Sequence, residues 1–570
     1  MTLTLATSSV DLQQDGNMNP SVALTIANAP GAVNVTVTGL PTGITAQYSS
    51  SAQLLSFSGG KNVAAGSYTV TVTAASGDQS ASKALTVVND VVTVVNSTVD
   101  TSLGVNGKLE QFFSTSFQIG SWTTDYFGTG TQATQRETTL SQLGPQHIRV
   151  QVVAGAVPMV AHTGASTDWN FKLIDTTLQP VLVTADQSPE LQIAVAPSWM
   201  CLSNGNLDVA DHLSDFATFM ANMVRYYNKG GFDSGGVHFQ SASSTPITWW
   251  GIFNEYKLNG LSDADYVKLY NAVVPAMLAV DPTIKISALE YSDFGLGTGD
   301  SGDPEVSMPV FTAGVTAPVD VISTHFYSTC SQKDSDSTLM ATVPQFAQNV
   351  QYFYKALQAT ATLTSVPVWV TENNVNADWS NNGMSACNPT QTFVTDKRGT
   401  SAFFAAWRPY VFSQLGKAGN RALYHWSYTA DQQYGEVDGS GNTFLSYWVD
   451  KTLETLYPST TASPGPSILS VDATDTSTVE TLATKSSSGV VTVMVANHAV
   501  GSSSDNNGAG APRTIVVETS GLGTFTSASL LTLDTNTSAS TGPVATTVTP
   551  SSRETITLSG YGTAFLTLKP

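Results

Sequence analysis

The chain has 570 residues, of which 41% are hydrophobic and 12% are charged, and its formal net charge is -20. Because this length exceeds what one hydrophobic core usually organises, we expect about two to four domains. The acidic balance, with Lys61 as the first basic residue, argues against nucleic acid and other polyanions as partners. An uncharged polymer suits such a surface better.

The composition also bears on location and on metal chemistry. No apolar run reaches membrane-spanning length, and the start "MTLTLATSSV" lacks the basic and apolar regions of an export signal. The Ser/Thr-rich, Lys-poor composition nevertheless indicates a secreted or cell-surface protein whose signal was removed. Three widely spaced cysteines and seven histidines without a pair at helical ligand spacing lead us to expect no metal and no cofactor.

Residues 1–90 alternate apolar and polar side chains in short runs such as "VNVTVTGL" and "SYTVTVTAA", with Gly, Pro and Ser between the runs. A period of two with frequent turns predicts a β-sandwich. The segments "GLPTGITAQ" and "GSYTVTVTA" resemble bacterial immunoglobulin-like modules, which usually serve as spacers or attachment domains. The same alternation returns over residues 456–570, for example in "GVVTVMVANHAV" and "GTAFLTLKP", and predicts a second β-sandwich there.

Residues 101–455 differ, because apolar runs alternate there with longer segments of helical period. The segment at 212–231 places Phe216, Phe219 and Met220 on one stripe, continued by Met223, Val224 and Tyr227, and a second helix is expected after a Ser262 cap. The apolar runs are eight in number: "SFQIGSW", "HIRVQVV", "LQIAVAPSWM", "ITWWGIFNE", "KISALEYSD", "DVISTHFYS", "VPVWVTENN" and "ALYHWSYT". Eight apolar strands with intervening helices predict an α/β fold, a parallel (β/α)₈ TIM barrel.

Polar residues gather where these predicted strands end, which is the functional face of such a barrel. They are Arg149, Asn254, Glu255, Glu290, His325, Tyr327, Glu372 and Trp426. Two glutamates, Glu255 at the end of the fourth strand and Glu372 at the end of the seventh, are the minimum set for breaking a glycosidic bond by double displacement. One carboxyl protonates the leaving oxygen and the other attacks the anomeric carbon.

The motifs "FNE" on the fourth strand and "VTEN" on the seventh resemble the acid/base and nucleophile motifs of clan A glycoside hydrolases. The resemblance extends to "HFY" on the sixth strand and to the Trp of "HWSY" on the eighth. Within the clan, "LGPQHIRVQ", "DWNFKLID", "FATFMANMVRYY" and the trailing "VMVANH" are similar to the family of β-xylosidases and α-iduronidases. The segment "VTENNVN" departs from that family's pattern after the nucleophile, which leaves the sugar open.

This resemblance implies a carbohydrate substrate and a role for each matching residue. It implies that Glu255 is the acid/base and Glu372 the nucleophile, that Asn254 donates to the sugar 2-hydroxyl, and that Tyr327 holds Glu372. We expect Glu255 to be protonated through desolvation, and Glu372 to stay ionised through hydrogen bonds from Tyr327 or Arg149. Trp426 would lie under the C–H face of the sugar.

The resembled family also builds its second sandwich from both ends of the chain. The segment "VVTVVNSTVD", residues 91–100, is too long and apolar for a free linker. We therefore expect residues 91–100 and 456–570 to form one accessory β-sandwich. Cys330 and Cys387 follow the sixth and seventh strands, so we expect a disulfide between them, with Cys201 reduced.

Alternatives remain open at several positions. Arg149 could simply neutralise buried carboxylates, His325 could be a core histidine, and Glu290 could belong to a surface loop. The string Gly-Asp-Ser-Gly around Ser301 matches a serine-protease motif, but we interpret it as a glycine-rich loop. The predicted function is a retaining β-glycosidase, with a β-xylosidase as one form of it. A glycosidase for a β-glucuronide or β-galactoside, and an inactive carbohydrate-binding or adhesive surface protein, are the other candidates.

Overall fold

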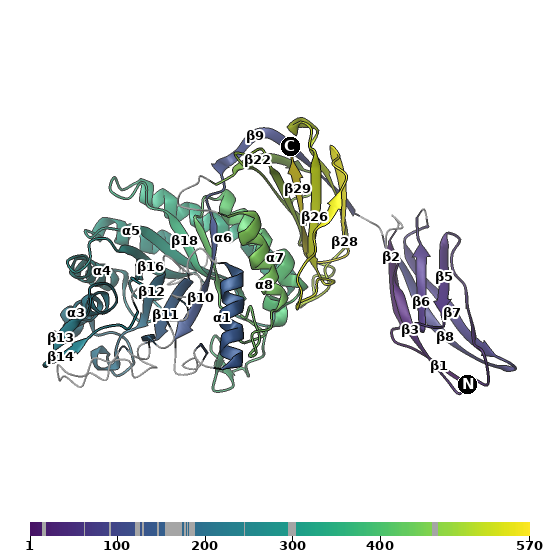
Figure 1. Cartoon of the computed structure of the whole chain (residues 1–570), viewed down its shortest axis with the longest axis horizontal. Coiled ribbons are helices and arrows are strands. Elements are labelled where there is room, and N and C mark those ends of the chain that lie inside the picture. The colour runs from purple at the N-terminus through teal and green to yellow at the C-terminus, as the bar shows by residue number, and fades with distance from the viewer. Residues whose placement is uncertain are drawn as a thin grey trace. The chain divides into compact units, whose positions relative to one another are not determined.

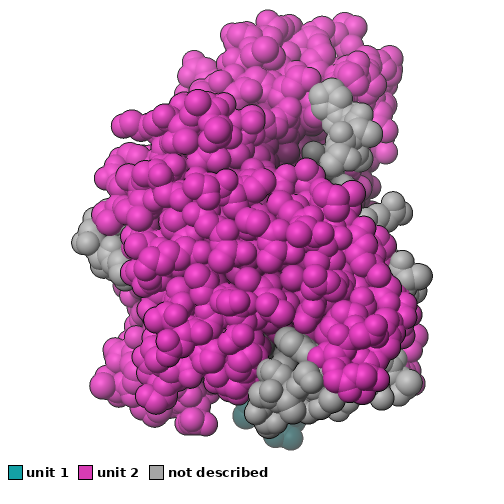
Figure 2. Space-filling view, turned by 90° about the vertical axis from the view of Figure 1, so that its left-hand side faces the viewer, with its two compact units in different colours: residues 1–94, 512–514 teal, residues 95–511, 515–570 magenta. Residues whose placement is uncertain are grey.

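The computed structural model describes residues 1–13, 19–61, 63–90, 93–119, 126–127, 130–144, 148–153, 171, 174–175, 178, 181, 189–243, 245–293, 304–458 and 465–570. The chain forms two compact units, which Figure 2 distinguishes by colour. Unit 1 comprises residues 1–94 and 512–514, and unit 2 comprises residues 95–511 and 515–570. Among the described helices, none is both long and apolar enough to cross a membrane.

Unit 1 contains two four-stranded sheets that share one apolar cluster. The alternating burial of strands such as Ser21–Ala27 turns Val22 and Leu24 into that cluster, which is the pattern expected for a sandwich. The first sheet has the order β1 (Thr2–Leu5), β3 (Ser21–Ala27), β6 (Leu54–Gly59) and β5 (Ile44–Ser49). The second has the order β2 (Ser9–Gln13), β8 (Gln79–Asp90), β7 (Gly66–Ser76) and β4 (Asn34–Thr38).

Unit 2 contains a closed eight-stranded barrel whose strands are all parallel, as predicted. Each strand coincides with one of the apolar runs of the sequence. The strands are β10 (Phe112–Ile119), β11 (Ile148–Val153), β12 (Glu190–Val195), β15 (Trp249–Gly251), β16 (Lys285–Asp293), β17 (Val321–Thr329), β18 (Val368–Asn376) and β21 (Ala422–Trp426). Every residue of β17 and β18 is buried, as expected for parallel strands covered on both faces.

Helices surround the barrel strands in Figure 1. They are α1 (Thr131–Leu143), α3 (Val209–Asn228), α4 (Asp263–Leu278), α5 (Pro304–Gly314), α6 (Asp336–Gln358), α7 (Ala402–Lys417) and α8 (Leu445–Leu456). The predicted apolar stripe of α3 is buried, and Ser262 caps α4 by accepting a 3.1 Å hydrogen bond from the backbone amide of Asp265. Short elements are η1 (Ser198–Met200), η2 (Lys397–Thr400), η3 (Ser520–Leu522), and the hairpins β13 (Phe232–Ser234) with β14 (Val237–Phe239) and β19 (Ser380–Asn381) with β20 (Met384–Ser385).

A nine-stranded sheet combines β9, which precedes the barrel in the chain, with strands that follow the barrel, and α7 lies between this sheet and the barrel (Figure 1). Helix α7 is mostly apolar and does not confine its apolar residues to one stripe. It is accordingly buried on nearly all sides. Its Phe403 packs edge-on against Tyr561, and the Thr563 hydroxyl donates to the Ala405 carbonyl at 2.7 Å. The strand order is β27 (Thr546–Val548), β26 (Ser527–Asp534), β29 (Gly562–Lys569), β24 (Val491–Asn497), β23 (Val479–Lys485), β22 (Ser467–Ala473), β9 (Thr93–Lys108), β25 (Arg513–Glu518) and β28 (Arg553–Leu558).

The fourth barrel strand is shorter than the run "ITWWGIFNE" suggested. It ends at Gly251, because Phe253 adopts a left-handed backbone with φ 67° that cannot continue an extended strand. Asn254 and Glu255 therefore lie just beyond the strand end. The expected disulfide joins the segments that follow the sixth and seventh strands, since the structure pairs Cys330 with Cys387 and leaves Cys201 as a free thiol. Ser301 and its glycine-rich string lie outside the described residues.

Strand β9 generates a test of where the N-terminal module can be removed. Ser97 and Val99 pair with Ala473 and Val471 of β22, and the side chains of Val95 and Val99 are buried in the core of the sheet. A chain that lacks residues 1–90 should unfold at the same temperature as unit 2 of the full chain. A chain that lacks residues 1–100 should unfold at a lower temperature, because each buried valine contributes about 1.5 to 3 kcal/mol. Differential scanning calorimetry measures both unfolding temperatures. Equal unfolding temperatures of the two truncated chains would contradict the assignment of residues 91–100 to the sheet.

Candidate active site

Glu255, His325 and Glu372 converge at the carboxyl-terminal ends of the barrel strands. One side-chain oxygen of each glutamate and a ring nitrogen of His325 all lie within 4.8 Å of one another. Nδ1 of His325 is 2.8 Å from Oε1 of Glu255 and 3.6 Å from Oε2 of Glu372. Glu372 is almost fully buried, and Glu255 is partly buried. The sequence thus predicted correctly that the two glutamates meet.

The backbone at two neighbouring strand ends is left-handed at residues that are not glycine. Phe253 and Glu255 have φ values of 67° and 41°, and Leu289 and Glu290 have φ values of 76° and 44°. Such conformations cost on the order of 1 kcal/mol or more each and persist only where the surroundings impose them. Here the amide of Glu255 donates to the carbonyl of Glu290 at 2.8 Å and joins the two strand ends. This hydrogen bond fixes the backbone segments that carry Glu255 and Glu290 relative to each other.

Arg149 is the cation of the site and is completely buried. Its Nη1 donates to Oε1 of Glu372 at 3.0 Å, and its Nη2 donates to Oδ1 of Asn254 at 3.0 Å and to Oε2 of Glu290 at 3.1 Å. Burial alone would lower the pKa of Arg149, but the charges of Glu290 and Glu372 outweigh burial and raise the pKa. One guanidinium therefore fixes three of the predicted site residues.

Glu290 lies below the two other carboxyl groups and is completely buried, so it is not part of a surface loop. Besides Arg149, it accepts hydrogen bonds from Ser287 at 2.8 Å and from Thr371 at 2.9 Å, and Nε2 of His325 is 3.3 Å away. Burial raises the pKa of Glu290, but Arg149 and His325 together reverse this and lower the pKa to about 2. Glu290 is therefore a carboxylate at neutral pH.

His325 links all three carboxyl groups. Burial lowers its pKa, but Glu372, Glu255 and Glu290 outweigh burial and raise the pKa to about 9. Both ring nitrogens are then protonated at neutral pH and can donate, one to Glu255 and one to Glu290. Burial raises the pKa of Glu255, with His325 opposing the shift. The site therefore favours a protonated Glu255 beside an ionised Glu290.

Glu372 accepts hydrogen bonds from three donors. Besides Arg149, the Tyr327 hydroxyl donates to its Oε2 at 2.8 Å, and Nε2 of Gln151 donates to its Oε1 at 2.8 Å. Both carboxylate oxygens are thereby held in place. Trp426 is half-buried at the end of β21, with its ring 6.0 Å from Cζ of Arg149. All eight residues predicted from the sequence thus belong to one connected cluster.

Among the members of this cluster that the sequence analysis did not predict, two lie on β12. Nε2 of Gln192 donates to Oδ1 of Asn254 at 2.8 Å, and Glu190 is a buried carboxyl whose pKa is raised by burial and by the nearby Glu290. Glu190 is the first residue of β12 and Gln192 is the third, so the two side chains lie on the same face of the strand. A polar side chain on alternate positions of an otherwise apolar strand was the available signal.

The group of Glu255, His325 and Glu372 has the composition of a metal site, and so does a second group formed by His425, Glu436 and Asp450. In the first group, the positive charge between the carboxylates already comes from Arg149 and from His325. Its chemistry is that of a hydrogen-bonded network, and we assign no metal to it.

In the second group, His425 and Asp450 are likewise occupied by contacts within the protein. Nδ1 of His425 is 2.5 Å from Oδ2 of Asp450, and its Nε2 is 2.6 Å from the carbonyl of Tyr434. Nε of Arg408 donates to Oδ1 of Asp450 at 2.9 Å. These contacts tie α7 and α8 to β21 and leave neither nitrogen of His425 available for a metal.

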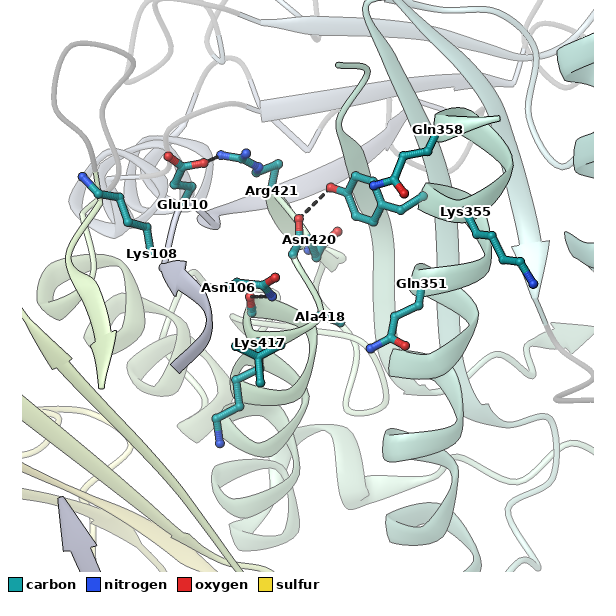
Figure 3. Close-up of a pocket in the computed structure, with 14 residues that line it drawn as sticks. Asn106, Lys108, Glu110, Gln351, Lys355, Gln358, Lys417, Ala418, Asn420 and Arg421 are labelled. Carbon is teal, nitrogen blue, oxygen red and sulfur yellow. Dashed lines mark hydrogen bonds and ion pairs between the residues drawn. The ribbon is translucent and has the colours of Figure 1, made fainter. Parts of the chain in front are cut away.

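A pocket of about 430 Å³ lies at the opposite end of the barrel, between the end of β9, α6 and the connection from α7 to β21. Figure 3 shows that the amino groups of Lys108, Lys355 and Lys417 point in different directions and do not converge on one point. Lys355 and Lys417 lie in the last turns of α6 and α7, where a cation complements the helix dipole. Arg421 is paired with Glu110. These charges have structural explanations, and we assign no ligand to the pocket.

The chain matches no protein-family model, and no curated protein sequence matches it. Its fold is similar to solved structures of glycoside hydrolases. The bacterial orthologue of human α-L-iduronidase has 14% identity and a TM-score of 0.58, with 84% of each chain covered. The GH51 arabinofuranosidase from Xanthomonas axonopodis pv. citri has 14% identity and a TM-score of 0.55, with 83% of this chain and 99% of that one covered. A family 44 xyloglucanase from Paenibacillus polymyxa has 11% identity and a TM-score of 0.50, with 84% and 100% covered.

Because these identities are low, the likeness concerns the fold alone. The family expected from the sequence includes α-iduronidases, and one such structure is among the similar ones. The GH51 and family 44 structures are similar to this chain over a comparable share of its length, so the fold does not choose between the families.

The pKa of Glu290 predicts how its removal changes stability with pH. Its folded value of about 2 lies below the ordinary value of 4.5, so its ionic contribution is fully present above pH 4.5 and is lost as the pH falls towards 2. At pH 7, Glu290→Gln should cost about 3 to 5 kcal/mol, because it breaks a buried ion pair. The difference from the parent protein in unfolding temperature should narrow below pH 4.5.

The matched control is Glu518→Gln, which makes the same chemical change at the exposed ion pair with Arg553. It should cost no more than about 1 kcal/mol. Thermal unfolding between pH 3 and pH 8 measures both variants. A Glu290→Gln penalty that does not vary with pH would mean that the loss is steric and not ionic.

Proposed function

We propose that this protein is a retaining glycoside hydrolase that cleaves O-glycosidic bonds by double displacement. The observation that carries the proposal is the approach of Glu255 and Glu372, whose nearest oxygens lie within 4.8 Å of each other. Retaining enzymes hold their two carboxyl groups about 5 to 5.5 Å apart, whereas inverting enzymes need about 6.5 to 9.5 Å to admit a water molecule. The fold supports this assignment, since solved structures of glycoside hydrolases share it.

In the first step, a carboxylate oxygen of Glu372 attacks the anomeric carbon while the bond to the leaving oxygen breaks. That oxygen takes its proton from Glu255, so the leaving group departs as an alcohol. Burial raises the pKa of Glu255, which favours the protonated form that this step needs. Tyr327, Gln151 and Arg149 orient the attacking carboxylate.

In the second step, Glu255 is ionised and removes a proton from water, and the water oxygen displaces Glu372 from the sugar. Both carboxyl groups then return to their starting states. His325 supports this exchange, because its Nδ1–H lies 2.8 Å from Glu255 and can stabilise the carboxylate formed after the first step. Its second ring N–H remains against Glu290 throughout.

Asn254 and Trp426 are proposed to bind the sugar. Oδ1 of Asn254 already accepts from Arg149 and from Gln192, so its amide group is fixed with Nδ2 as the remaining donor. This orientation suits donation to the sugar 2-hydroxyl. Trp426 offers a half-buried aromatic face beside Arg149. Glu290 is too deeply buried to touch a sugar, and we propose that it positions Arg149 and His325 instead.

We propose a plant or microbial polysaccharide, or oligosaccharides derived from it, as the substrate class. A β-xyloside is the first candidate from the sequence resemblance, and an arabinofuranoside is a second candidate because an arabinofuranosidase is among the similar structures. The disulfide between Cys330 and Cys387 supports a location outside the cytoplasm, where disulfides persist. Unit 1 would then act as an immunoglobulin-like spacer or attachment module.

A second candidate function is a carbohydrate-binding surface protein whose barrel has lost activity. Loss of selection on catalysis would first erase groups that serve only chemistry. Here both glutamates and the donors that orient Glu372 form an unbroken network, which favours the enzyme. A panel of 4-nitrophenyl glycosides, including β-D-xylopyranoside, β-D-glucopyranoside and α-L-arabinofuranoside, tests the two functions. Failure to cleave any of them would favour the binding protein.

The two carboxyl groups should respond differently to truncation. Glu372→Ala should lower turnover by about 10³-fold or more, because it removes the nucleophile. Sodium azide should restore cleavage of the aryl glycoside and yield a glycosyl azide, because the small anion fits the space of the lost carboxylate.

Glu255→Ala should still release acidic phenols in a rapid first turnover, since such leaving groups need little protonation. It should then accumulate a covalent adduct on Glu372, visible by mass spectrometry, for want of a base. Glu518→Ala serves as a control on the sheet and should act like the parent protein. Azide rescue of Glu255→Ala but not of Glu372→Ala would reverse the two assignments.

A further inference from the structure

The segment that follows β18 builds a well-defined hairpin on the same face of the barrel as Glu372. Strands β19 and β20 pair through Ser380 with Ser385 and Asn381 with Met384. The two residues between them, Asn382 and Gly383, have φ values of 52° and 84°. Two consecutive left-handed residues of the Asn-Gly type form the tight turn that best matches the twist of a hairpin. The segment therefore forms a regular two-residue β-hairpin and not an irregular loop.

The base of this hairpin is fixed by Asp378, which is 5% exposed. Its carboxylate accepts hydrogen bonds from the amides of Trp379 and Cys387, both at 3.0 Å, and its carbonyl accepts from the side chains of Gln433 and Tyr434. Cys387 is also bonded to Cys330, on the segment that follows β17. The hairpin is thus anchored to two neighbouring segments on the catalytic face.

Trp379 lies on this anchored base and is 54% exposed. It is the most exposed of the tryptophans that the structure describes. Its backbone is held on both sides, because its amide donates to Asp378 and its carbonyl accepts from Ala386 at 2.9 Å. A large aromatic side chain that is kept in solvent by a rigid frame loses little further entropy when a ligand stacks on it.

Trp379 is connected to the catalytic centre through Asp378 and Tyr434. The hydroxyl of Tyr434 donates to the carbonyl of Asp378. The carbonyl of Tyr434 in turn accepts a 3.2 Å hydrogen bond from the side-chain amide of Asn374, which lies two residues after Glu372 on β18. Trp379 therefore lies on the segment that leaves the carboxyl-terminal end of β18, the strand that carries Glu372.

We propose that Trp379 forms an additional sugar subsite, in which its indole stacks on the C–H face of a sugar unit next to the one attacked by Glu372. The inference rests on the proposed function and extends it by naming the substrate as an oligosaccharide or polysaccharide. The apolar face of a pyranose or furanose ring and the flat indole are complementary in shape and polarity. An isolated sugar bound only at Glu372 would leave Trp379 unused.

Titration calorimetry with xylopentaose, cellopentaose and arabinopentaose tests this subsite. The measurement uses the full chain carrying Glu372→Gln, so that nothing is cleaved. In that background, Trp379→Ala should weaken the binding of the preferred pentasaccharide by about tenfold or more, as is typical when a central aromatic contact is lost. Trp379→Phe should recover most of the affinity, because it restores an aromatic face.

The matched control is Val394→Ala, which truncates another exposed apolar residue of the same connecting segment, 53% exposed. It should leave the affinity unchanged. Affinity that is equal with and without Trp379, or no binding of any of the three pentasaccharides, would overturn the subsite. Hydrolysis of aryl glycosides by the parent protein is measured separately. Binding without any hydrolysis would sink the proposed function while leaving the subsite intact.

Discussion

The buried guanidinium of Arg149 is the contact on which the catalytic face depends. It donates to Glu372, Asn254 and Glu290, which come from three different strand ends, and it is completely excluded from solvent. A buried cation is tolerated only when it is paired and hydrogen-bonded. The same pairing that neutralises Arg149 therefore sets the positions of the groups that would perform the chemistry.

The barrel makes this arrangement possible because the carboxyl-terminal ends of its parallel strands all lie on one face. Arg149 comes from β11, Glu290 from β16, His325 from β17 and Glu372 from β18, and the parallel registers bring them side by side. Local strain completes the placement, since Glu255 and Glu290 adopt left-handed backbones that join through one hydrogen bond. The scaffold is regular, and its irregular points are where the carboxyl groups lie.

Much of this could be predicted from the sequence, for a physical reason. Fully buried parallel strands require continuous apolar runs, so the eight barrel strands and the polar residues at their ends were visible as breaks in those runs. The left-handed turns at Phe253 and Leu289 were not visible, because neither residue type favours that conformation and tertiary contacts impose it.

Depth inside the barrel was equally hidden from the sequence. In the sequence, Glu290 and Glu372 both come near the end of an apolar run. In the structure, Glu290 is completely buried, whereas Glu372 keeps 5% of its surface exposed. Gln192 and Glu190 on β12 were missed because their strand carries no recognisable motif. The Cys330–Cys387 bond was predictable because consecutive strands of a barrel place their following segments side by side.

The central claim is that Glu255 and Glu372 are too close for a water molecule to attack the sugar directly. Proton NMR of the first product formed from an aryl glycoside tests this claim most directly, because the anomeric signal is recorded before the free sugar equilibrates. Double displacement predicts that the first-formed sugar has the same anomeric configuration as the substrate. A first-formed product of inverted configuration would contradict the account and would make Glu372 a base that activates water.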